Sequence, residues 1–351
     1  MPFAAVNAPV DGRLRGIALR AAIGCDILLN HQNMDFEGSK SSRFDALLGR
    51  RCWLGWCLAV GFAAPLASAA ERAAPRVLAT TTVVADLLRQ VAGDRVAIDT
   101  LMGPGIDPHG YKATPRDADR LARADLVVAS GLHLEGKLGE LLAKLGRRAP
   151  VVAVAESLPQ DRLLEVAPGL HDPHVWFDAR LWSLATPAAA EALAALDPSG
   201  ADTYRERARD YASRLERLDD ALGARVATIP AERRVLVTAH DAFRYFGRAY
   251  GIEVVGVQGT STESEAGIAD INRLVDLIVA RKLPAVFVET SVSDRNVQAL
   301  QEGARARGQP VALGGRLYSD SLGGPGSGAE TLEAVLAANV ETIVAGLAGE
   351  R

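Results

Sequence analysis

The sequence is poor in cysteine and has no concentrated positive charge. Its 351 residues include three cysteines, Cys25, Cys52 and Cys57, all within the first 60 positions. The rest of the chain therefore offers neither a disulfide framework nor a thiolate metal site. The formal net charge is −4, and no cluster of Lys and Arg marks the basic face that a nucleic-acid partner requires. These absences argue against nucleic-acid binding.

An apolar run long enough for a comfortable membrane span is missing as well. The run CWLGWCLAVGFAAPLA follows the arginines at 50–51 and leads into small residues at Ala67 and Ala69. A basic start, a short apolar run and a small-x-small site are typical of a secretory signal peptide; a buried helix or an uncleaved anchor is the alternative. Neither Cys52 nor Cys57 sits in a lipoprotein-type context, so we expect an exported protein without a lipid anchor.

After residue 75, short apolar runs alternate with amphipathic helical patterns. Strands are predicted at 76–82, 95–102, 124–130 and 150–156 in the first half, and at 234–240, 252–259, 284–290 and 310–315 in the second. Alternating strands and helices predict parallel sheets that are covered on both faces. The expected fold is therefore α/β, with two lobes that each hold a central, mostly parallel four-stranded sheet flanked by helices.

The segment between the two halves predicts one long helix. Its apolar residues recur every three or four positions, at Tyr204, Ala208, Tyr211, Leu215, Leu218, Leu222 and Val226, which is the spacing of one helical face. The predicted organisation is a leader at 1–70 with the signal peptide at about 50–70, an N-terminal lobe at 71–198, a linking helix at 199–230 and a C-terminal lobe at 231–351. A stiff linking helix predicts little hinge motion between the lobes.

Histidine is the residue type that carries chemistry here. Three of the six histidines, and one aspartate, each follow a predicted strand: His109, His174, His240 and Asp320. In open parallel sheets, ligands bind outside the carboxyl ends of the strands. Two of these residues come from each half, so all four are expected to converge in the cleft between the lobes. His31 falls in the leader, and His133 and His171 are weaker candidates because each can be explained by its own loop.

Proline and acidic residues flank these histidines. His109 and His174 each follow an Asp-Pro pair. Proline restricts the backbone, so the imidazole loses less conformational entropy when it captures an ion. Asp107, Asp172 and Asp241 are candidates to accept a hydrogen bond from the ring nitrogen that does not face the ion.

Several motifs resemble a known family, in the family's own order. They are GPGIDPHGYKATPRD, GLHLEGK, DPHVWFD, TAHDAFRYFGRAYG, STESEAG, PAVFVETSVSDRN and LYSDSLG. The sequence from about Val77 onward is similar to the cluster A-I (TroA-like) solute-binding proteins of bacterial zinc and manganese ABC importers.

The resemblance implies two α/β lobes bridged by one long helix and a single ion held between them. It implies His109, His174, His240 and Asp320 as the metal ligands. It also implies a periplasmic, monomeric receptor that works with a membrane permease and its ATPase.

Three imidazoles and one carboxylate suit Zn²⁺, whereas Mn²⁺ prefers more oxygen ligands and a higher coordination number. Zn²⁺ is therefore the favoured cargo and Mn²⁺ the alternative. A secreted zinc hydrolase is a competing interpretation, but catalytic zinc keeps an open position for water and the sequence has no His-Glu-x-x-His motif. A metal-binding adhesin is a third. We expect a transport protein with no catalytic residues, whose metal affinity falls below about pH 6.5 because coordinating histidine must be neutral.

Overall fold

The computed structural model describes residues 74–147 and 149–348. These residues belong to one compact unit. The predicted leader at 1–70, with its signal peptide and its three cysteines, lies outside the described residues. Among the helices that the described residues form, none combines the length and the apolar character of a membrane span.

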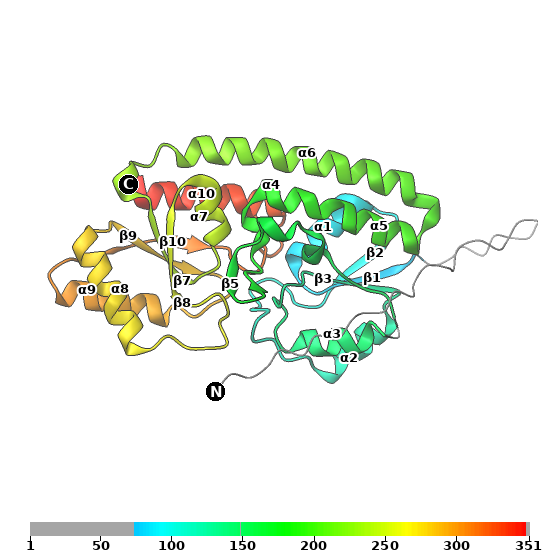
Figure 1. Cartoon of the computed structure of the whole chain (residues 1–351), viewed down its shortest axis with the longest axis horizontal. Helices are drawn as coiled ribbons and strands as arrows, with labels where there is room; N and C mark the ends of the chain where they lie inside the picture. The colour runs from blue at the N-terminus through cyan, green and yellow to red at the C-terminus, as the bar shows by residue number, and fades with distance from the viewer. Residues whose placement is uncertain (1–73, 148, 349–351) are drawn as a thin grey trace, which may run out of the picture. The chain divides into compact units, whose positions relative to one another are not determined.

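A four-stranded parallel sheet forms the centre of the first lobe, as predicted (Figure 1). Its strands are β1 (Arg76–Ala79), β2 (Ala97–Thr100), β3 (Leu126–Ala129) and β4 (Val151–Ala153), in the order β2-β1-β3-β4. Residues alternate between two hydrophobic clusters: Val77 and Val128 face one, while Leu78 and Val127 face the other. Because the two central strands, β1 and β3, are buried on both faces, they read as apolar runs after Arg76, whereas the edge strand β2 is partly exposed and contains Asp99.

Helices cover both faces of this sheet. They are α1 (Thr82–Ala92), α2 (Pro115–Arg123), α3 (Leu138–Leu145) and α5 (Thr186–Leu196). α2 begins at Pro115, and the preceding residue Thr114 caps it: its hydroxyl accepts from the N–H of Asp117, whose carboxylate accepts from the N–H of Thr114. This reciprocal cap satisfies two backbone donors at the helix start and ends the loop that holds His109.

The second lobe also contains four parallel strands, but they pair differently from the prediction. β7 (Val235–His240) pairs with β8 (Glu253–Gln258), and β9 (Ala285–Glu289) pairs with β10 (Ala312–Leu317). β7 lies against β9, yet the two pairs are separate sheets. At the end of β7 the N–H of His240 donates to the carboxylate of Glu289 rather than to a backbone carbonyl. The α/β class is confirmed; one continuous four-stranded sheet in this lobe is not.

The helices of the second lobe are α7 (Arg244–Tyr250), α8 (Ile268–Arg281), α9 (Arg295–Ala306) and α10 (Leu332–Ala348). Elements that the sequence did not predict include the antiparallel pair β5 (Glu165–Ala167) and β6 (Leu170–His171), and the short helix α4 (Ala179–Trp182).

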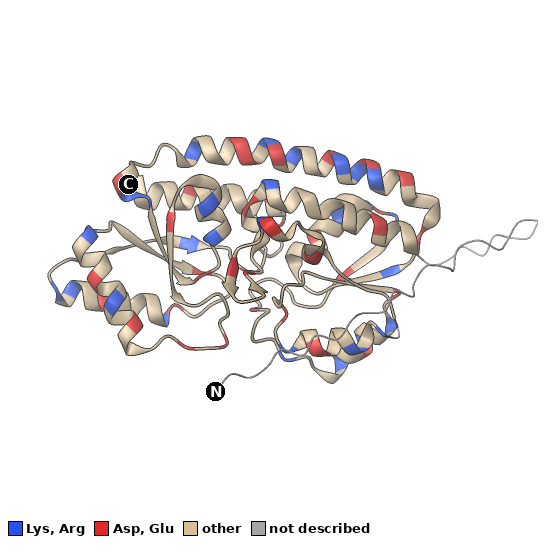
Figure 2. Ribbon diagram, in the orientation of Figure 1, with Lys and Arg blue, Asp and Glu red and all other residues tan. Residues whose placement is uncertain are grey.

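The long helix α6 (Ala201–Val226) runs along both lobes (Figure 1). It packs against α1 and α5 of the first lobe and against α7 and α10 of the second. The predicted apolar stripe is buried except for Leu218, which is half-buried, and charged residues of both signs lie along the helix (Figure 2). One hydrophobic cluster extends from Val77 through Tyr211 to Leu347. Because the lobes share this core, wide opening would expose apolar surface, which is costly.

Candidate metal centre

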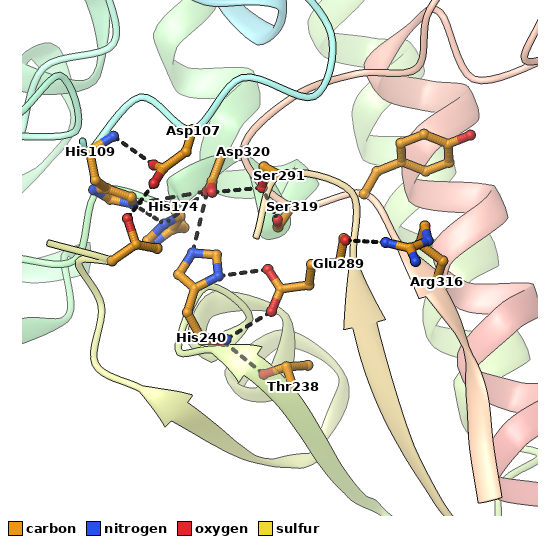
Figure 3. A network of polar contacts seen from close by, with 12 residues as sticks. Asp107, His109, His174, Thr238, His240, Glu289, Ser291, Arg316, Ser319 and Asp320 are labelled. Atoms are coloured by element: carbon orange, nitrogen blue, oxygen red, sulfur yellow. Dashed lines mark hydrogen bonds and ion pairs between the residues drawn. The ribbon is translucent and has the colours of Figure 1, made fainter. Parts of the chain in front are cut away.

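The structure brings together the four residues that the sequence singled out (Figure 3). His109 lies in the loop between β2 and α2, His174 in the loop after β6, His240 at the last position of β7, and Asp320 just after β10. One ligand atom from each lies within 4.8 Å of every other. His133 and His171 are not part of this cluster: His133 is exposed, and His171 lies in β6, paired with Glu165.

The atoms that face one another have the spacing of a metal shell. Oδ1 of Asp320 lies 3.2 Å from Nε2 of His174, 3.5 Å from Nε2 of His240 and 4.0 Å from Nε2 of His109. The Nε2 atoms of His109 and His174 are 3.2 Å apart. Two ligands at about 2.1 Å from a tetrahedral ion are about 3.4 Å apart, so these separations fit one small cation.

All four residues are buried, with at most 2% of the surface of each exposed. Within the described part of the chain, Oδ1 of Asp320 and Nε2 of His240 have no hydrogen-bond partner. Buried polar atoms are normally paired, because leaving them unpaired costs free energy. The chemistry and the unpaired donor atoms of this cluster therefore fit a divalent transition metal.

Two of the histidines contact a buried carboxylate through Nδ1, the ring nitrogen that faces away from the cluster. Oδ1 of Asp172 lies 2.8 Å from Nδ1 of His174 and accepts from its backbone N–H at 3.0 Å. Oε2 of Glu289 lies 2.6 Å from Nδ1 of His240, and Oε1 accepts from the N–H of His240 at 2.8 Å. Both contacts direct Nε2 toward the centre of the cluster, which is the arrangement that fixes ligand orientation in metal sites.

The three predicted carboxylate partners have different outcomes. Asp172 is confirmed. Asp107 contacts the backbone N–H of His109 at 2.8 Å rather than its ring. The prediction for Asp241 was wrong: its Oδ2 lies 3.8 Å from Nε of Arg244. Glu289 is the carboxylate that contacts the ring of His240. The sequence did carry a signal for Glu289, since it is the next-to-last residue of the predicted strand 284–290 and so lies at that strand's carboxyl end, as His240 does in the strand 234–240.

A second set of contacts holds Asp320. Ser291 donates to Oδ2 of Asp320 at 3.0 Å and lies 2.7 Å from the hydroxyl of Ser319. Trp176, one residue beyond the loop of His174, donates its indole N–H to the carbonyl of Ser319 at 3.2 Å. Oδ2 is thus occupied, and Oδ1 is left facing the three imidazoles.

The three histidines differ in the direction in which their surroundings shift the pKa. Burial, opposed by Asp320, lowers the pKa of His109 to about 3. Burial by itself lowers the pKa of His174, but the close contacts of its ring with Asp172 and Asp320 outweigh burial and raise the pKa to about 9. Burial is likewise outweighed at His240, where Glu289 and Asp320 hold the pKa well above its usual value.

Asp320 shows the reciprocal effect. Although burial opposes it, the charge on His240 and the close contact with His174 hold the pKa of Asp320 well below its usual value. The metal-free cluster therefore holds an ionised carboxylate beside protonated histidines, and a divalent cation would replace those protons.

Comparison with known proteins gives consistent matches. Residues 77–346 match the family model ZnuA, described as zinc-uptake complex component A, periplasmic. The zinc-binding protein TroA of Treponema pallidum is 44% identical over 299 residues, which cover 85% of this chain and 97% of that protein. The manganese-binding lipoprotein MntA of Bacillus subtilis is 44% identical over 273 residues, which cover 78% of this chain and 89% of the relative.

The solved structures agree with this assignment. The structure of the periplasmic zinc-binding protein TroA from Treponema pallidum matches with a TM-score of 0.76 at 45% identity, over 78% of this chain and 99% of that one. The extent of the family match and the identity to full-length relatives confirm the resemblance seen in the motifs. The chain belongs to the ZnuA family of periplasmic zinc-uptake components, together with the TroA-like metal-binding proteins.

Proposed function

We propose that this protein is the solute-binding component of a metal ABC importer. It captures one divalent transition-metal ion between its lobes, with His109, His174, His240 and Asp320 as ligands, and delivers the ion to a membrane permease driven by an ATPase. The observation that carries this proposal is the buried cluster of four convergent donors, in which one carboxylate oxygen and one imidazole nitrogen have no partner within the described residues.

Zn²⁺ is the preferred cargo and Mn²⁺ the alternative. The family model and TroA are named for zinc, and MntA for manganese. Three imidazole nitrogens and one carboxylate oxygen at tetrahedral separations favour Zn²⁺, which accepts nitrogen readily at coordination number four. Mn²⁺ would need further oxygen ligands, and Oδ2 of Asp320 is already engaged by Ser291.

We propose transport without catalysis, and the same geometry supports it. A catalytic zinc site usually keeps three protein ligands and one open position where water is activated. Four protein ligands fill a tetrahedral shell, so a hydrolase would need one of them to remain unbound. The adhesin alternative has no feature of the described residues in its favour.

Release of the metal follows a local movement rather than a wide hinge. α6 packs on both lobes and one hydrophobic cluster runs through them. We therefore propose that loops at the cluster shift while the lobes stay together, with boundaries at 71–198, 199–230 and 231–351.

The cellular setting is part of the proposal. We infer a monomeric periplasmic protein that is exported by a signal peptide at about 50–70 and carries no lipid anchor. Several relatives, MntA among them, are named lipoproteins, so radiolabelled palmitate incorporation is the direct test of the last point.

The test of function is metal analysis of the purified protein, followed by calorimetric titration of the metal-free form with Zn²⁺ and with Mn²⁺. We expect one ion per chain and tighter binding of Zn²⁺. His174→Ala should bind Zn²⁺ at least about 100-fold more weakly, because it removes a ligand whose loss the buried shell cannot replace. Circular dichroism checks that the variant folds. Unchanged affinity in a folded variant would show that the ligand assignment is wrong.

A further inference from the structure

The three histidines of the cluster are not held equally. Each of His174 and His240 is held at two points by one carboxylate, which contacts both the backbone N–H and the ring Nδ1. The two carboxylates, Asp172 and Glu289, are completely buried. At His174 the ring contact is a hydrogen bond, whereas at His240 it is an ion-pair contact at 2.6 Å without hydrogen-bond geometry. Both contacts restrain the rotation of the ring about its side-chain torsions before an ion arrives.

Asp320 is fixed in a similar way. Its Oδ2 accepts from Ser291, which in turn contacts Ser319, and the carbonyl of Ser319 accepts from Trp176. Rotation of this carboxylate would break a partly buried hydrogen bond, which costs free energy. Three of the four donors are therefore held by partners of their own.

His109 lacks such a partner on its ring. Among the described residues, its only contact with a carboxylate at hydrogen-bonding distance is from its backbone N–H to Asp107 at 2.8 Å. Its carbonyl packs on Gly136, where an added Cβ would come within 2.1 Å of that oxygen. The backbone of His109 is thus held by partners of its own. Its buried ring meets the neighbouring imidazoles, with Nε2 3.2 Å from Nε2 of His174, and has no carboxylate at hydrogen-bonding distance among the described residues.

His109 also lies nearest to solvent. In its loop, Gly105, Ile106 and Gly110 are exposed, with Ile106 at 41%. The residues on either side of His174, by contrast, are buried. The loop that holds His109 is therefore more exposed than the segment that holds His174.

One contact from the opposite lobe restrains this loop. The hydroxyl of Thr262, in the segment 259–267 between β8 and α8, donates to Oδ2 of Asp107. The other oxygen of Asp107 accepts from the N–H of His109, so one carboxylate joins the second lobe to the backbone of a ligand in the first. An exposed ion pair between Lys137 and Glu263, at 3.8 Å, lies beside it and adds little because solvent screens it.

We propose that His109 is the first ligand to leave when Zn²⁺ is released, and that Thr262 is a positioning residue that slows this step from the opposite lobe. This inference rests on the proposed function of metal capture. The hydroxyl of Thr262 acts through Asp107 and is not itself a metal ligand. Its removal should therefore change the rate of zinc release while the four metal ligands stay the same.

The test is the rate at which zinc-loaded protein loses its metal to an excess of chelator, followed by stopped flow. Thr262→Val keeps the shape and removes the hydroxyl; we expect release to be about tenfold faster, as for loss of one hydrogen bond to a charged group. Thr262→Ser restores the hydroxyl and should release zinc within about twofold of the wild type, by the same reasoning. Ser264→Ala, an exposed change in the same segment, is the matched control and should have no effect.

A second measurement tests the order of the ligands. His109→Ala should keep weak, fast-exchanging zinc binding through the three fixed donors, whereas His240→Ala should lose more affinity. Equal release rates for Thr262→Val and wild type, or a larger loss for His109→Ala than for His240→Ala, would overturn this inference. Wild-type protein that binds no zinc would instead defeat the proposed function, so the two failures are distinguishable.

Discussion

The zinc affinity should rise steeply with pH across the neutral range, because the ion must displace protons from the site. In the metal-free protein, His174 has a pKa raised to about 9, and that of His240 is held well above its usual value. Both therefore carry a proton at pH 7 that must leave before Nε2 can bind a metal. His109, whose pKa is lowered to about 3, is already neutral and has no proton to lose.

About two protons should thus be released for each zinc ion bound between pH 5 and pH 8. The logarithm of the affinity then rises by about two for each pH unit, which corresponds to about 2.7 kcal/mol per unit. Histidines with ordinary pKa values of about 6.5 would give almost no dependence above pH 7. The structure therefore moves the expected loss of affinity to higher pH than the sequence indicated.

Calorimetry in two buffers with different ionisation enthalpies counts these protons directly. At pH 7.5 we expect about two per zinc, and a flat affinity with no proton release would refute the reasoning.

The same shift has the opposite effect on the metal-free fold. The folded-state pKa of His174 lies above its unfolded value, so its stabilisation is complete below about pH 6.5 and is lost as the pH rises through about 9. Thermal unfolding of metal-free protein at pH 6 and pH 9 should show this loss.

Three further changes test individual contacts. Glu289→Gln should weaken zinc binding about 10–100-fold, as measured by calorimetry. An amide N–H facing Nδ1 of His240 favours the tautomer that carries its proton on Nε2, and a protonated Nε2 cannot bind the metal. Leu215→Ala should lower the free energy of unfolding in urea by about 2–5 kcal/mol, because it leaves a cavity in the core beneath α6. Gly136→Ala should weaken zinc binding measurably in the same titration, because the added Cβ would collide with the carbonyl of His109 and a φ of +41° disfavours alanine.

Matched variants separate these effects from general damage. Glu302→Gln, exposed on α9, should bind zinc as the wild type does. Gly139→Ala places its Cβ where no atom lies within 4 Å, so zinc affinity should not change. Equal losses in a variant and its match would contradict the assigned contact. For Leu215→Ala, a free energy of unfolding within about 0.5 kcal/mol of the wild type, the range of ordinary surface changes, would contradict its place in the core.

The sequence by itself determined the strands, the long helix and the four residues of the cluster. Strands appear as apolar runs and α6 as a stripe with a period of three or four residues, because burial imposes the geometry of each element on its own sequence. The convergence of His109, His240 and Asp320 was predictable for a related reason: each follows a parallel strand, and the carboxyl ends of parallel strands share one edge of a sheet. His174 was predicted with them from the strand at 150–156, but the structure places the antiparallel pair β5 and β6 between that strand and His174.

Only the tertiary structure decided which residue contacts and orients each ligand. Asp241 is the neighbour of His240 in sequence, yet Glu289, 49 residues away, makes the contact, because β9 lies beside β7. The split of the second lobe into two strand pairs, the core shared by both lobes and the lack of a carboxylate beside the ring of His109 likewise depend on how distant segments pack. Local sequence patterns indicate which side of a helix or strand is buried. Which residue packs against that side depends on strand order and on packing across the whole fold.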